Sequence, residues 1–342
     1  MTNTNRTILV TGGAGFIGSN FVTYMVNTYP DYNIINLDKL TYAGSLDNLI
    51  EIENKKNYTF LKGDISDAEF INSVFESYPI TDVIHLAAES HVDRSIKDGT
   101  TFVETNVLGT FNLLQAAKKS WKQDSNLEDH RFHHISTDEI YGSLESDGMF
   151  SEETPYDPRN PYSATKASSN MLVKSFGYTY DMDIVISSCS NNYGPKQHKE
   201  KLIPTIIHNA LTEQPIPIYG DGQNIRDWIY VEDHCSALDT IFHNGESMNT
   251  YNVGGRTEKT NIEIVNSICD LLDDLHPISS KVIKSYRELI TFTEDRLGHD
   301  RRYAVDDSKI RETLNWTQMT RFETGLKNTI EWYVNKWKTP SN

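Results

Sequence analysis

Cysteine, basic residues and long apolar runs are all scarce in this chain of 342 residues. The three cysteines, Cys189, Cys235 and Cys269, share no CxxC spacing, so the sequence implies neither a disulfide framework nor a zinc site. Acidic residues outnumber basic ones by 48 to 32, and the formal net charge of −16 opposes binding to nucleic acid. This charge leaves room for a local basic pocket that binds a small phosphate ligand.

No apolar run reaches the roughly 18 residues that a membrane helix needs. The polar start MTNTNRT leads straight into an apolar strand and does not have the pattern of a signal peptide. We therefore expect a cytoplasmic protein with neither a membrane nor a nucleic-acid partner.

Strand and helix patterns alternate through the first half of the chain. Strands are expected at 7–11, 33–38, 59–64, 82–88, 132–137 and 183–188, and helices at 17–28, 67–77, 100–120 and 161–180. This alternation predicts an α/β fold with a doubly wound parallel sheet of the Rossmann type. Short, fully apolar strands agree with a sheet that is covered on both faces.

The pattern becomes irregular after residue 190, which predicts a second, smaller C-terminal lobe. The segment from about 230 to 255 returns to a helix followed by a strand. We expect a dinucleotide-binding domain of residues 1–192 plus about 230–255. The smaller substrate-binding lobe would comprise about 193–229 plus 256–342.

A glycine-rich turn stands between the first strand and the first helix. Gly12, Gly15 and Gly18 satisfy GxxGxxG, and glycines there let the backbone approach a pyrophosphate at the helix N-terminus. Asp38 ends the second strand 20 residues after Gly18, where a carboxylate can accept hydrogen bonds from the ribose hydroxyls. The combination predicts a dinucleotide site that prefers NAD to NADP, although a glycine turn and an aspartate can also serve packing and turn formation.

Tyr162 and Lys166 have the YxxxK spacing at the start of an expected helix. Residues four apart share one helical face, so the phenol and the ammonium point the same way. A nearby lysine and a positive nicotinamide ring would lower the pKa of the phenol toward neutrality and make it a usable base. The spacing is common by chance, but downstream of a dinucleotide turn it predicts oxidation of an alcohol.

Thr137, Asp138 and Glu139 follow the strand that should lie beside this helix. Two adjacent carboxyl groups suit an elimination of water, with one protonated and the other ionised. The alternative is a solvated pair of loop acids. His130, His133 and His134 lack a matching ligand set, so we expect no metal.

With these residues in hand, the sequence resembles the dTDP-glucose 4,6-dehydratase family, nucleotide-sugar dehydratases of the extended short-chain dehydrogenase/reductase type. The resemblance runs over essentially the whole chain. It rests on the segments TGGAGFIGSN, LDKLTYAG, HLAAESHVDRSI, STDEIYG, PYSATKA, NNYGP, YGDGQNIRDWIYVEDH and DRLGHDRRYA. The glycine motif and YxxxK identify only the superfamily, whereas the Thr-Asp-Glu triplet and DRLGHD are more specific.

The resemblance implies a lyase that uses NAD and regenerates it, on a route to dTDP-rhamnose or other deoxysugars. Tyr162, aided by Thr137 and Lys166, would take the C4 hydroxyl proton of dTDP-glucose as hydride leaves C4. Glu139 would then remove the C5 proton while Asp138 protonates the departing C6 hydroxyl. Hydride returned to C6 gives the 4-keto-6-deoxy sugar.

The resemblance also assigns residues to the two ligands by their matching positions. For NAD they are Gly12, Gly15, Phe16, Ile17, Gly18, Asp38, Lys39, Leu40, Thr41, Asp64, Ile65, Leu86, Ala87, Ala88, Glu89, Ser90, Thr105, Tyr162, Lys166 and Asn192. For the nucleotide sugar they are Ser90, Thr137, Tyr162, Asn191, Lys201, Leu202, Pro217, Ile218, Tyr219, Arg226, Asn261, Asp295, Arg296, Leu297, Gly298 and His299.

Arg226 and Arg296 would offer guanidinium groups to the diphosphate, although each could instead form a surface ion pair. Leu297 stands where the family usually has proline, which affects only the local loop. The resemblance further implies a homodimer joined by the helices at 100–120 and 161–180. The alternative functions are a nucleotide-sugar 4-epimerase or decarboxylase and a non-catalytic NAD-binding regulator.

Overall fold

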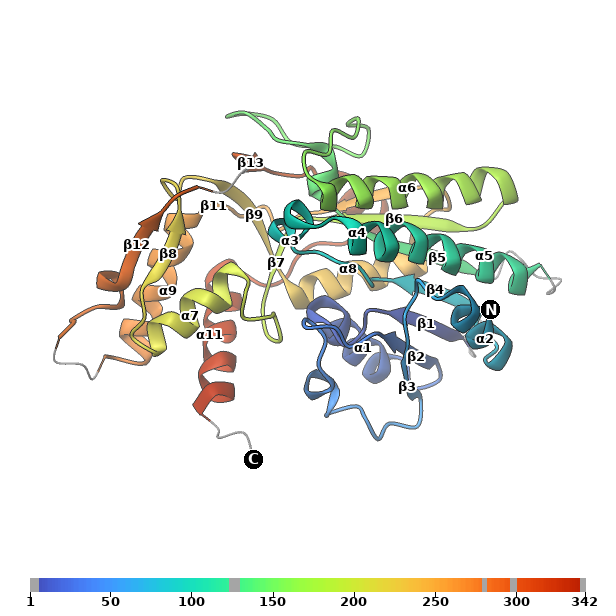
Figure 1. Ribbon diagram of the computed structural model, residues 1–342, viewed down its shortest axis with the longest axis horizontal. Helices are drawn as coiled ribbons and strands as arrows, with labels where there is room; N and C mark the ends of the chain where they lie inside the picture. The colour runs from blue at the N-terminus through green and yellow to red at the C-terminus, as the bar shows by residue number, and fades with distance from the viewer. Residues whose placement is uncertain (1–5, 123–129, 279–281, 296–299, 339–342) are drawn as a thin grey trace.

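A seven-stranded parallel sheet forms the centre of the larger part of the molecule (Figure 1). The computed structural model describes residues 6–122, 130–278, 282–295 and 300–338. The strand order is β10-β6-β5-β4-β1-β2-β3. The strands are β1 (Thr7–Thr11), β2 (Asn33–Asp38), β3 (Tyr58–Lys62), β4 (Asp82–His85), β5 (Arg131–Thr137), β6 (Ile184–Cys189) and β10 (Thr250–Val253). The predicted doubly wound fold is confirmed.

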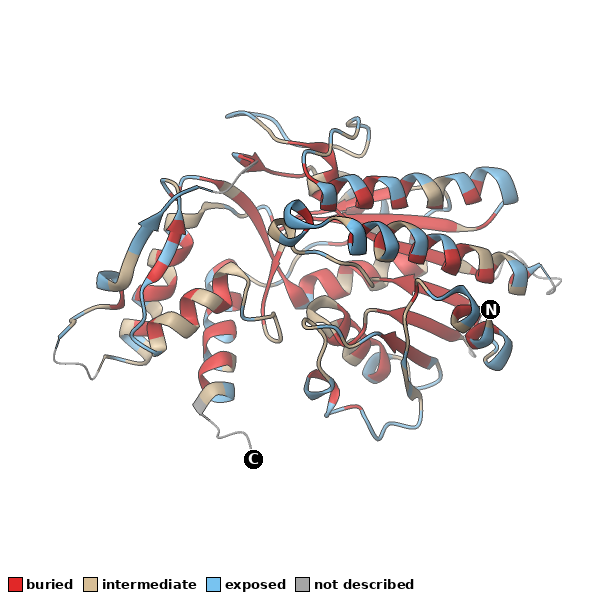
Figure 2. Ribbon diagram, viewed as in Figure 1, coloured by how far each residue is buried: buried red, intermediate tan, exposed pale blue. Residues whose placement is uncertain are grey.

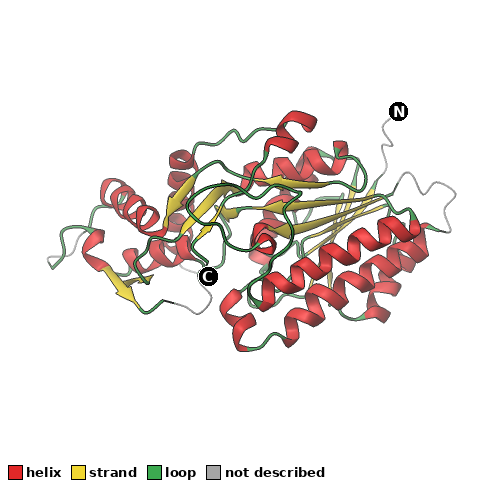
Figure 3. Cartoon of the chain, turned by 90° about the horizontal axis from the view of Figure 1, so that it is seen from above, coloured by secondary structure: helices red, strands yellow, loops and turns green. Residues whose placement is uncertain are grey.

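Helices cover both faces of this sheet (Figure 3). On one face, α1 (Phe16–Thr28) and α8 (Val231–Asn244) pack their apolar residues against β1 and β4. On the other, α2 (Ala68–Ser77), α5 (Thr110–Trp121) and α6 (Pro161–Tyr180) lie side by side over a second core. Because both faces are covered, the strands other than the edge strand β3 are almost entirely buried (Figure 2).

The helix expected at 100–120 is present, but it is not α-helical throughout. A short α4 (Thr100–Phe102) passes into a π-helical turn, η2 (Val103–Gly109), before α5 begins. At Gly109 an added Cβ would lie 2.5 Å from Ile65 Cγ1, so the turn packs closely on the chain after β3. Apolar periodicity does not distinguish i→i+5 from i→i+4 hydrogen bonding over so short a stretch.

The second lobe is built from two small sheets and three packed helices. One sheet contains β7 (Asn191–Tyr193), β9 (Ile225–Tyr230), β11 (Glu258–Thr260) and β13 (Arg302–Tyr303), and the other pairs β8 (Ile216–Tyr219) with β12 (Ile290–Thr293). The helices are α7 (Leu202–Leu211), α9 (Asn261–Leu275) and α11 (Phe322–Lys338), which share one apolar core. In the chain, α8 and β10 come between β9 and β11 of the second lobe. They return to the larger part of the molecule, where β10 pairs with β6 of the seven-stranded sheet.

The remaining elements are short. They are α3 (Val92–Lys97), α10 (Ser308–Leu314) and the 3₁₀ turns η1 (Leu46–Leu49), η4 (Asp138–Tyr141) and η5 (Tyr286–Leu289). Among the described helices, none combines the length and apolar character of a membrane span. The described residues also contain no group of three or more His, Cys, Asp or Glu side chains that could hold a metal ion.

Candidate active site

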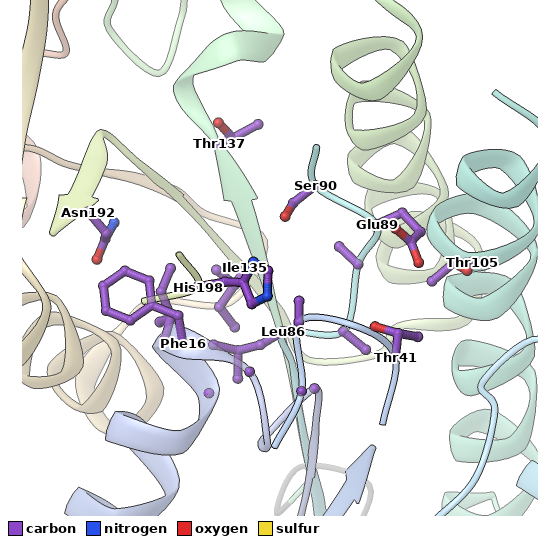
Figure 4. A pocket seen from close by; sticks show the side chains of 18 of the residues that line it. Phe16, Thr41, Leu86, Glu89, Ser90, Thr105, Ile135, Thr137, Asn192 and His198 are labelled. Atoms are coloured by element: carbon purple, nitrogen blue, oxygen red, sulfur yellow. The ribbon is translucent and has the colours of Figure 1, made fainter. Parts of the chain in front are cut away.

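A cavity of about 340 Å³ opens at the carboxyl ends of β1, β4, β5 and β6. Its lining contains Thr137, Asp138 and Glu139 from the end of β5, and Tyr162 and Lys166 from α6. Every residue that the resemblance assigns to NAD also lines it, except Leu40. Figure 4 shows side chains reaching the cavity from α1, from the segment after β4 and from β5. Residues up to 189 positions apart in sequence, from Gly12 to Lys201, therefore meet in one place.

Of the three glycines of the GxxGxxG motif, the fold requires two and does not require the third. A Cβ on Gly12, whose φ is +76°, would lie 2.6 Å from Ala87 N, and a Cβ on Gly18 would lie 2.1 Å from Gly12 O. At Gly15 the nearest protein atom would be 3.4 Å away, and the backbone there is extended at φ −76°. Gly15 is thus dispensable for packing but lines the cavity at the N-terminus of α1, where its missing side chain leaves space for an anionic ligand.

Asp38 ends β2 with its carboxylate directed into the glycine turn. One oxygen accepts a hydrogen bond from Ala14 N at 2.9 Å, and the other accepts one from Leu40 N at 2.7 Å. Each oxygen keeps a further lone pair for a ribose hydroxyl. The neighbouring Lys39 ammonium is 2.5 Å from a carboxylate oxygen of Asp64, so this cation is already paired. The site therefore suits an NAD ribose better than one bearing a 2′-phosphate.

Tyr162 and Lys166 lie in the first turns of α6. The helix begins after Asn160, whose side chain accepts a hydrogen bond from Ser163 N at 2.9 Å. The Lys166 ammonium donates to Ile135 O of β5 at 2.7 Å, which fixes the lysine under the cavity. Burial lowers the pKa of Lys166 to about 8. The lysine is therefore still charged at neutral pH but loses its charge as the pH rises through about 8.

The pKa of Tyr162 moves in the opposite direction from the one the sequence suggested. Burial raises it well above the usual 10, the carboxylate of Glu139 adds to the rise, and the Thr137 side chain partly opposes it. In the polypeptide alone the phenol is therefore protonated. A positive charge from a bound nicotinamide ring is the remaining influence that would bring the phenol into working range.

Asp138 and Glu139 are adjacent in sequence but differ in their surroundings. Asp138 is 2% exposed, and one of its oxygens accepts a hydrogen bond from the Thr137 hydroxyl at 3.2 Å. Burial, together with the carboxylates of Glu139 and Asp227, raises the pKa of Asp138 to about 8. Glu139 is only half-buried in the cavity wall, and its backbone N–H donates to the Thr137 hydroxyl. At neutral pH Asp138 is therefore suited to give a proton.

Only some of the residues expected to bind the nucleotide sugar line the cavity. Ser90, Thr137, Tyr162, Asn191 and Lys201 line the cavity. The other described ones lie outside its lining: Leu202, Pro217, Ile218, Tyr219, Arg226, Asn261 and Asp295. Residues 296–299, which include Arg296, Leu297, Gly298 and His299, lie outside the described residues.

Arg226 is not presented to the cavity as a free guanidinium. It is 6% exposed on β9, donates to Ile225 O at 2.7 Å and to Asp300 O at 2.9 Å, and stacks 4.4 Å from the Tyr303 ring. Its charge acts on Asp138, where it opposes the rise in the pKa.

Several cavity residues were missed by sequence reasoning. They are Leu37, Ala43, Gly44, Gly63, Ile135, Ser136, Cys189, Ser190, Gln197, His198 and Glu200. The rule that ligands bind outside the carboxyl ends of parallel strands could have found Cys189 and Ser190, because they end β6 as Thr137 ends β5. For His198 and Glu200, which lie in an irregular segment, no comparable signal exists.

Comparison with known proteins agrees with this geometry. A family model described as GDP-mannose 4,6 dehydratase matches residues 9–329. The dTDP-glucose 4,6-dehydratase of Neisseria gonorrhoeae is 50% identical over 336 residues, which cover 97% of each chain.

Two solved structures extend the comparison. The dTDP-glucose 4,6-dehydratase of Bacillus anthracis in complex with NAD has a TM-score of 0.86 at 42% identity, over 97% of this chain and 98% of that one. DesIV of Streptomyces venezuelae, a dTDP-glucose 4,6-dehydratase with NAD and TYD bound, has a TM-score of 0.87 at 40% identity, with the same coverage. This chain belongs to the dTDP-glucose 4,6-dehydratase family.

Proposed function

We propose that the chain converts dTDP-glucose to dTDP-4-keto-6-deoxyglucose and water, with NAD as a cofactor that is regenerated in each cycle. The observation that carries this proposal is the pair of unlike carboxyl groups beside Tyr162 and Lys166. A dehydrogenase or a 4-epimerase needs the tyrosine and lysine but has no use for a buried, protonated Asp138 next to Glu139. Identity of 50% to a curated dehydratase over nearly the whole chain supports the same reaction.

The residues that would hold NAD are the glycine turn, Asp38 and the segments after β3 and β4 that line the cavity. The open position at Gly15 and the carboxylate of Asp38 fit a pyrophosphate and a ribose, respectively. When bound, NAD⁺ supplies the hydride chemistry, accepting a hydride from C4 and returning it at C6. The polypeptide has to supply every proton transfer.

In the first step Tyr162 takes the proton of the C4 hydroxyl. The Thr137 hydroxyl lies close enough to lower the pKa of the phenol, and the Lys166 ammonium is held on the same helical face. Glu139 then removes the C5 proton, which the C4 ketone has made acidic. Asp138 protonates the C6 hydroxyl so that it leaves as water and a C5–C6 double bond forms. Glu139 returns its proton to C5 as hydride arrives at C6. The proton that Tyr162 took from the C4 hydroxyl must then pass through solvent to Asp138, which restores both groups for the next cycle.

Exposed apolar side chains on one surface support a homodimer. Val103, Leu108, Phe111, Met171 and Tyr178 are 37–78% exposed on η2, α5 and α6, which pack against one another. Figure 2 shows exposed stretches along the outer sides of α5 and α6. Apolar side chains gathered on neighbouring helices are typical of a protein interface. We propose that a second copy of this chain covers them.

Incubation with dTDP-, UDP-, CDP- and GDP-glucose tests the proposed reaction and its nucleotide. We expect a 4-keto-6-deoxy product from dTDP-glucose, recognised by its absorbance in alkali, and almost no turnover by Tyr162→Phe. Formation of the galactose epimer instead would contradict the proposal and favour a 4-epimerase.

Glu139→Gln should separate oxidation from elimination. The amide cannot accept the C5 proton, so we expect the reduced-nicotinamide absorbance to appear on adding dTDP-glucose while dehydrated product falls by about 10²-fold or more. Glu145→Gln is the matched control, because Glu145 is exposed in the following loop and should leave turnover unchanged. A normal yield of product from Glu139→Gln would refute the role of Glu139.

The pKa values predict an alkaline limit on activity. Asp138 must be protonated and Lys166 charged, and both have pKa values of about 8, so kcat/KM should fall as pH rises through about 8. Single-turnover measurements separate the two, because Lys166 affects C4 oxidation and Asp138 affects loss of water. A kcat/KM that stays constant from about pH 7 to about pH 9 would show that neither group titrates as required.

Gly15→Ala should weaken NAD binding without unfolding the protein. The added methyl group fills ligand space but has no protein clash, so the free energy of unfolding should change by less than about 0.5 kcal/mol. Gly18→Ala, whose Cβ would lie 2.1 Å from Gly12 O, should lose both stability and binding. Calorimetric titration with NAD and urea unfolding measure the two quantities; equal NAD affinity in Gly15→Ala and wild type would contradict the placement.

Met171→Glu should dissociate the proposed dimer. Light scattering should give about twice the chain mass of 39.0 kDa for wild type and one chain mass for the variant, because a charge at the interface is costly to bury. Met319→Glu is the control, since Met319 is also exposed but lies outside these helices. A monomeric wild type would rule out this interface.

A further inference from the structure

A buried chain of hydrogen bonds passes through the ring of His85, beneath the cavity. Thr11 Oγ1 lies 2.7 Å from His85 Nδ1, and Thr110 Oγ1 lies 2.9 Å from His85 Nε2. At one end Ala87 N–H donates to Thr11 Oγ1 at 3.3 Å, and at the other the Thr110 hydroxyl donates to Asn106 O at 2.5 Å. Thr11, His85, Thr110 and Asn106 are each at most 1% exposed.

The partners at the two ends fix the direction of every bond in this chain. A threonine hydroxyl has one proton, and that of Thr110 is given to Asn106 O, which can only accept. Thr110 Oγ1 must therefore accept from His85, so Nε2 carries a proton. If the ring is neutral, Nδ1 has no proton and accepts the hydroxyl proton of Thr11. Thr11 Oγ1 in turn accepts from Ala87 N–H.

The surroundings of His85 keep the ring neutral. Burial lowers its pKa well below the usual 6.5, and the charge of Lys166 lowers it further. The other ionisable group against the ring is His134 of β5, whose ring centroid is 5.1 Å away and which is itself buried. The influences on the ring therefore all oppose a positive charge, which agrees with the tautomer that the hydrogen bonds require.

The chain joins the cofactor side of the cavity to the catalytic helix. The Asn106 side chain pairs with the main chain of Glu89, accepting from its N–H at 2.8 Å and donating to its C=O at 3.0 Å. The same amide donates to the Thr165 hydroxyl at 2.9 Å, and that hydroxyl donates to Tyr162 O at 2.8 Å. The Ser169 hydroxyl of α6 also donates to Asn106 O, at 2.6 Å. Asn106 is thus the junction between the segment after β4, η2 and α6.

We propose that His85, as the neutral Nε2–H tautomer, is a positioning residue that holds Asn106 where it fixes the cofactor-lining segment 86–90 relative to Tyr162 and Lys166. It touches neither ligand and acts through Thr11, Thr110 and Asn106. The inference deepens the proposed function and rests on it, because the groups positioned are those of the oxidation step. The second lobe takes no part in this network, so nucleotide binding should not depend on it.

Kinetics of two variants at Thr110 test the proposal. Thr110→Val keeps the shape but removes both hydrogen bonds, and a small displacement of reacting groups should lower kcat about 10–100-fold. The KM for dTDP-glucose should stay within about 3-fold, and Thr110→Ser, which keeps the hydroxyl, should restore kcat to within about 3-fold of wild type. His133→Gln is the control, because it disturbs an equally buried histidine that bonds to Ser187 in the same sheet, and its kcat should be unchanged.

Equal kcat values in Thr110→Val and Thr110→Ser would overturn the proposal. A second measurement is made on the wild-type chain and needs a variant only to assign signals: ¹⁵N spectra of the histidine-labelled protein report each ring's tautomer. The His85 signals, identified by their loss in His85→Gln, should be those of a neutral Nε2–H ring from about pH 8 down to about pH 5. A Nδ1–H tautomer, or titration near the ordinary pKa, would equally overturn it.

The tautomer is measured without substrate, which separates the two proposals. A wild-type chain that binds NAD and shows the expected tautomer but does not dehydrate dTDP-glucose would overturn the proposed function and leave the hydrogen-bond assignment standing. A chain that dehydrates dTDP-glucose with the other tautomer would overturn only the role of His85.

Discussion

Every neighbouring pair in the seven-stranded sheet runs parallel, so the carboxyl ends of its strands meet at one edge. The glycine turn follows β1, the segment 86–90 follows β4, and the Asp138–Glu139 pair follows β5. An antiparallel neighbour would send one of these groups to the far side of the molecule. The parallel arrangement requires helical connections, and one of those, α6, delivers Tyr162 and Lys166 to the same edge. Hydrogen bonding in the sheet thus decides where the chemistry takes place.

The two adjacent carboxyl groups acquire different properties from their surroundings alone. Both line the cavity, but Asp138 is almost fully buried and is influenced by the charge of Asp227, whereas Glu139 is only half-buried. Burial removes water from both forms of a carboxyl group, but the ionised form loses far more hydration free energy. Burial therefore keeps Asp138 protonated, while the less buried Glu139 can act as a base. The family resemblance implied Asp138 as the acid and Glu139 as the base. This difference in burial supports the same assignment independently of the resemblance.

Local features of the sequence predicted the fold and much of the cavity. Gly18 packs on Gly12, and Tyr162 and Lys166 share one helical face, so short patterns reveal these features. The state of Tyr162 was misjudged because its pKa depends on burial and on Glu139, contacts that appear only once the chain has folded. Arg226 is similarly engaged by Asp300, 74 residues away. The π-helical turn η2 was not predicted from the sequence. Its Asn106 is hydrogen-bonded to Glu89 and Ser169, and the periodicity of a helix does not encode such contacts.

The position of β10 has a consequence for how the protein is made. This strand pairs with β6 at the edge of the main sheet, and α8 before it supplies apolar residues to the core beneath β1. In the sequence, α8 and β10 come after β7, α7, β8 and β9 of the second lobe. During synthesis the ribosome must therefore release the chain through Val253 before the first sheet has its last strand. The first 190 residues would meanwhile hold an open sheet edge and an uncovered apolar face, the kind of surface that chaperones recognise.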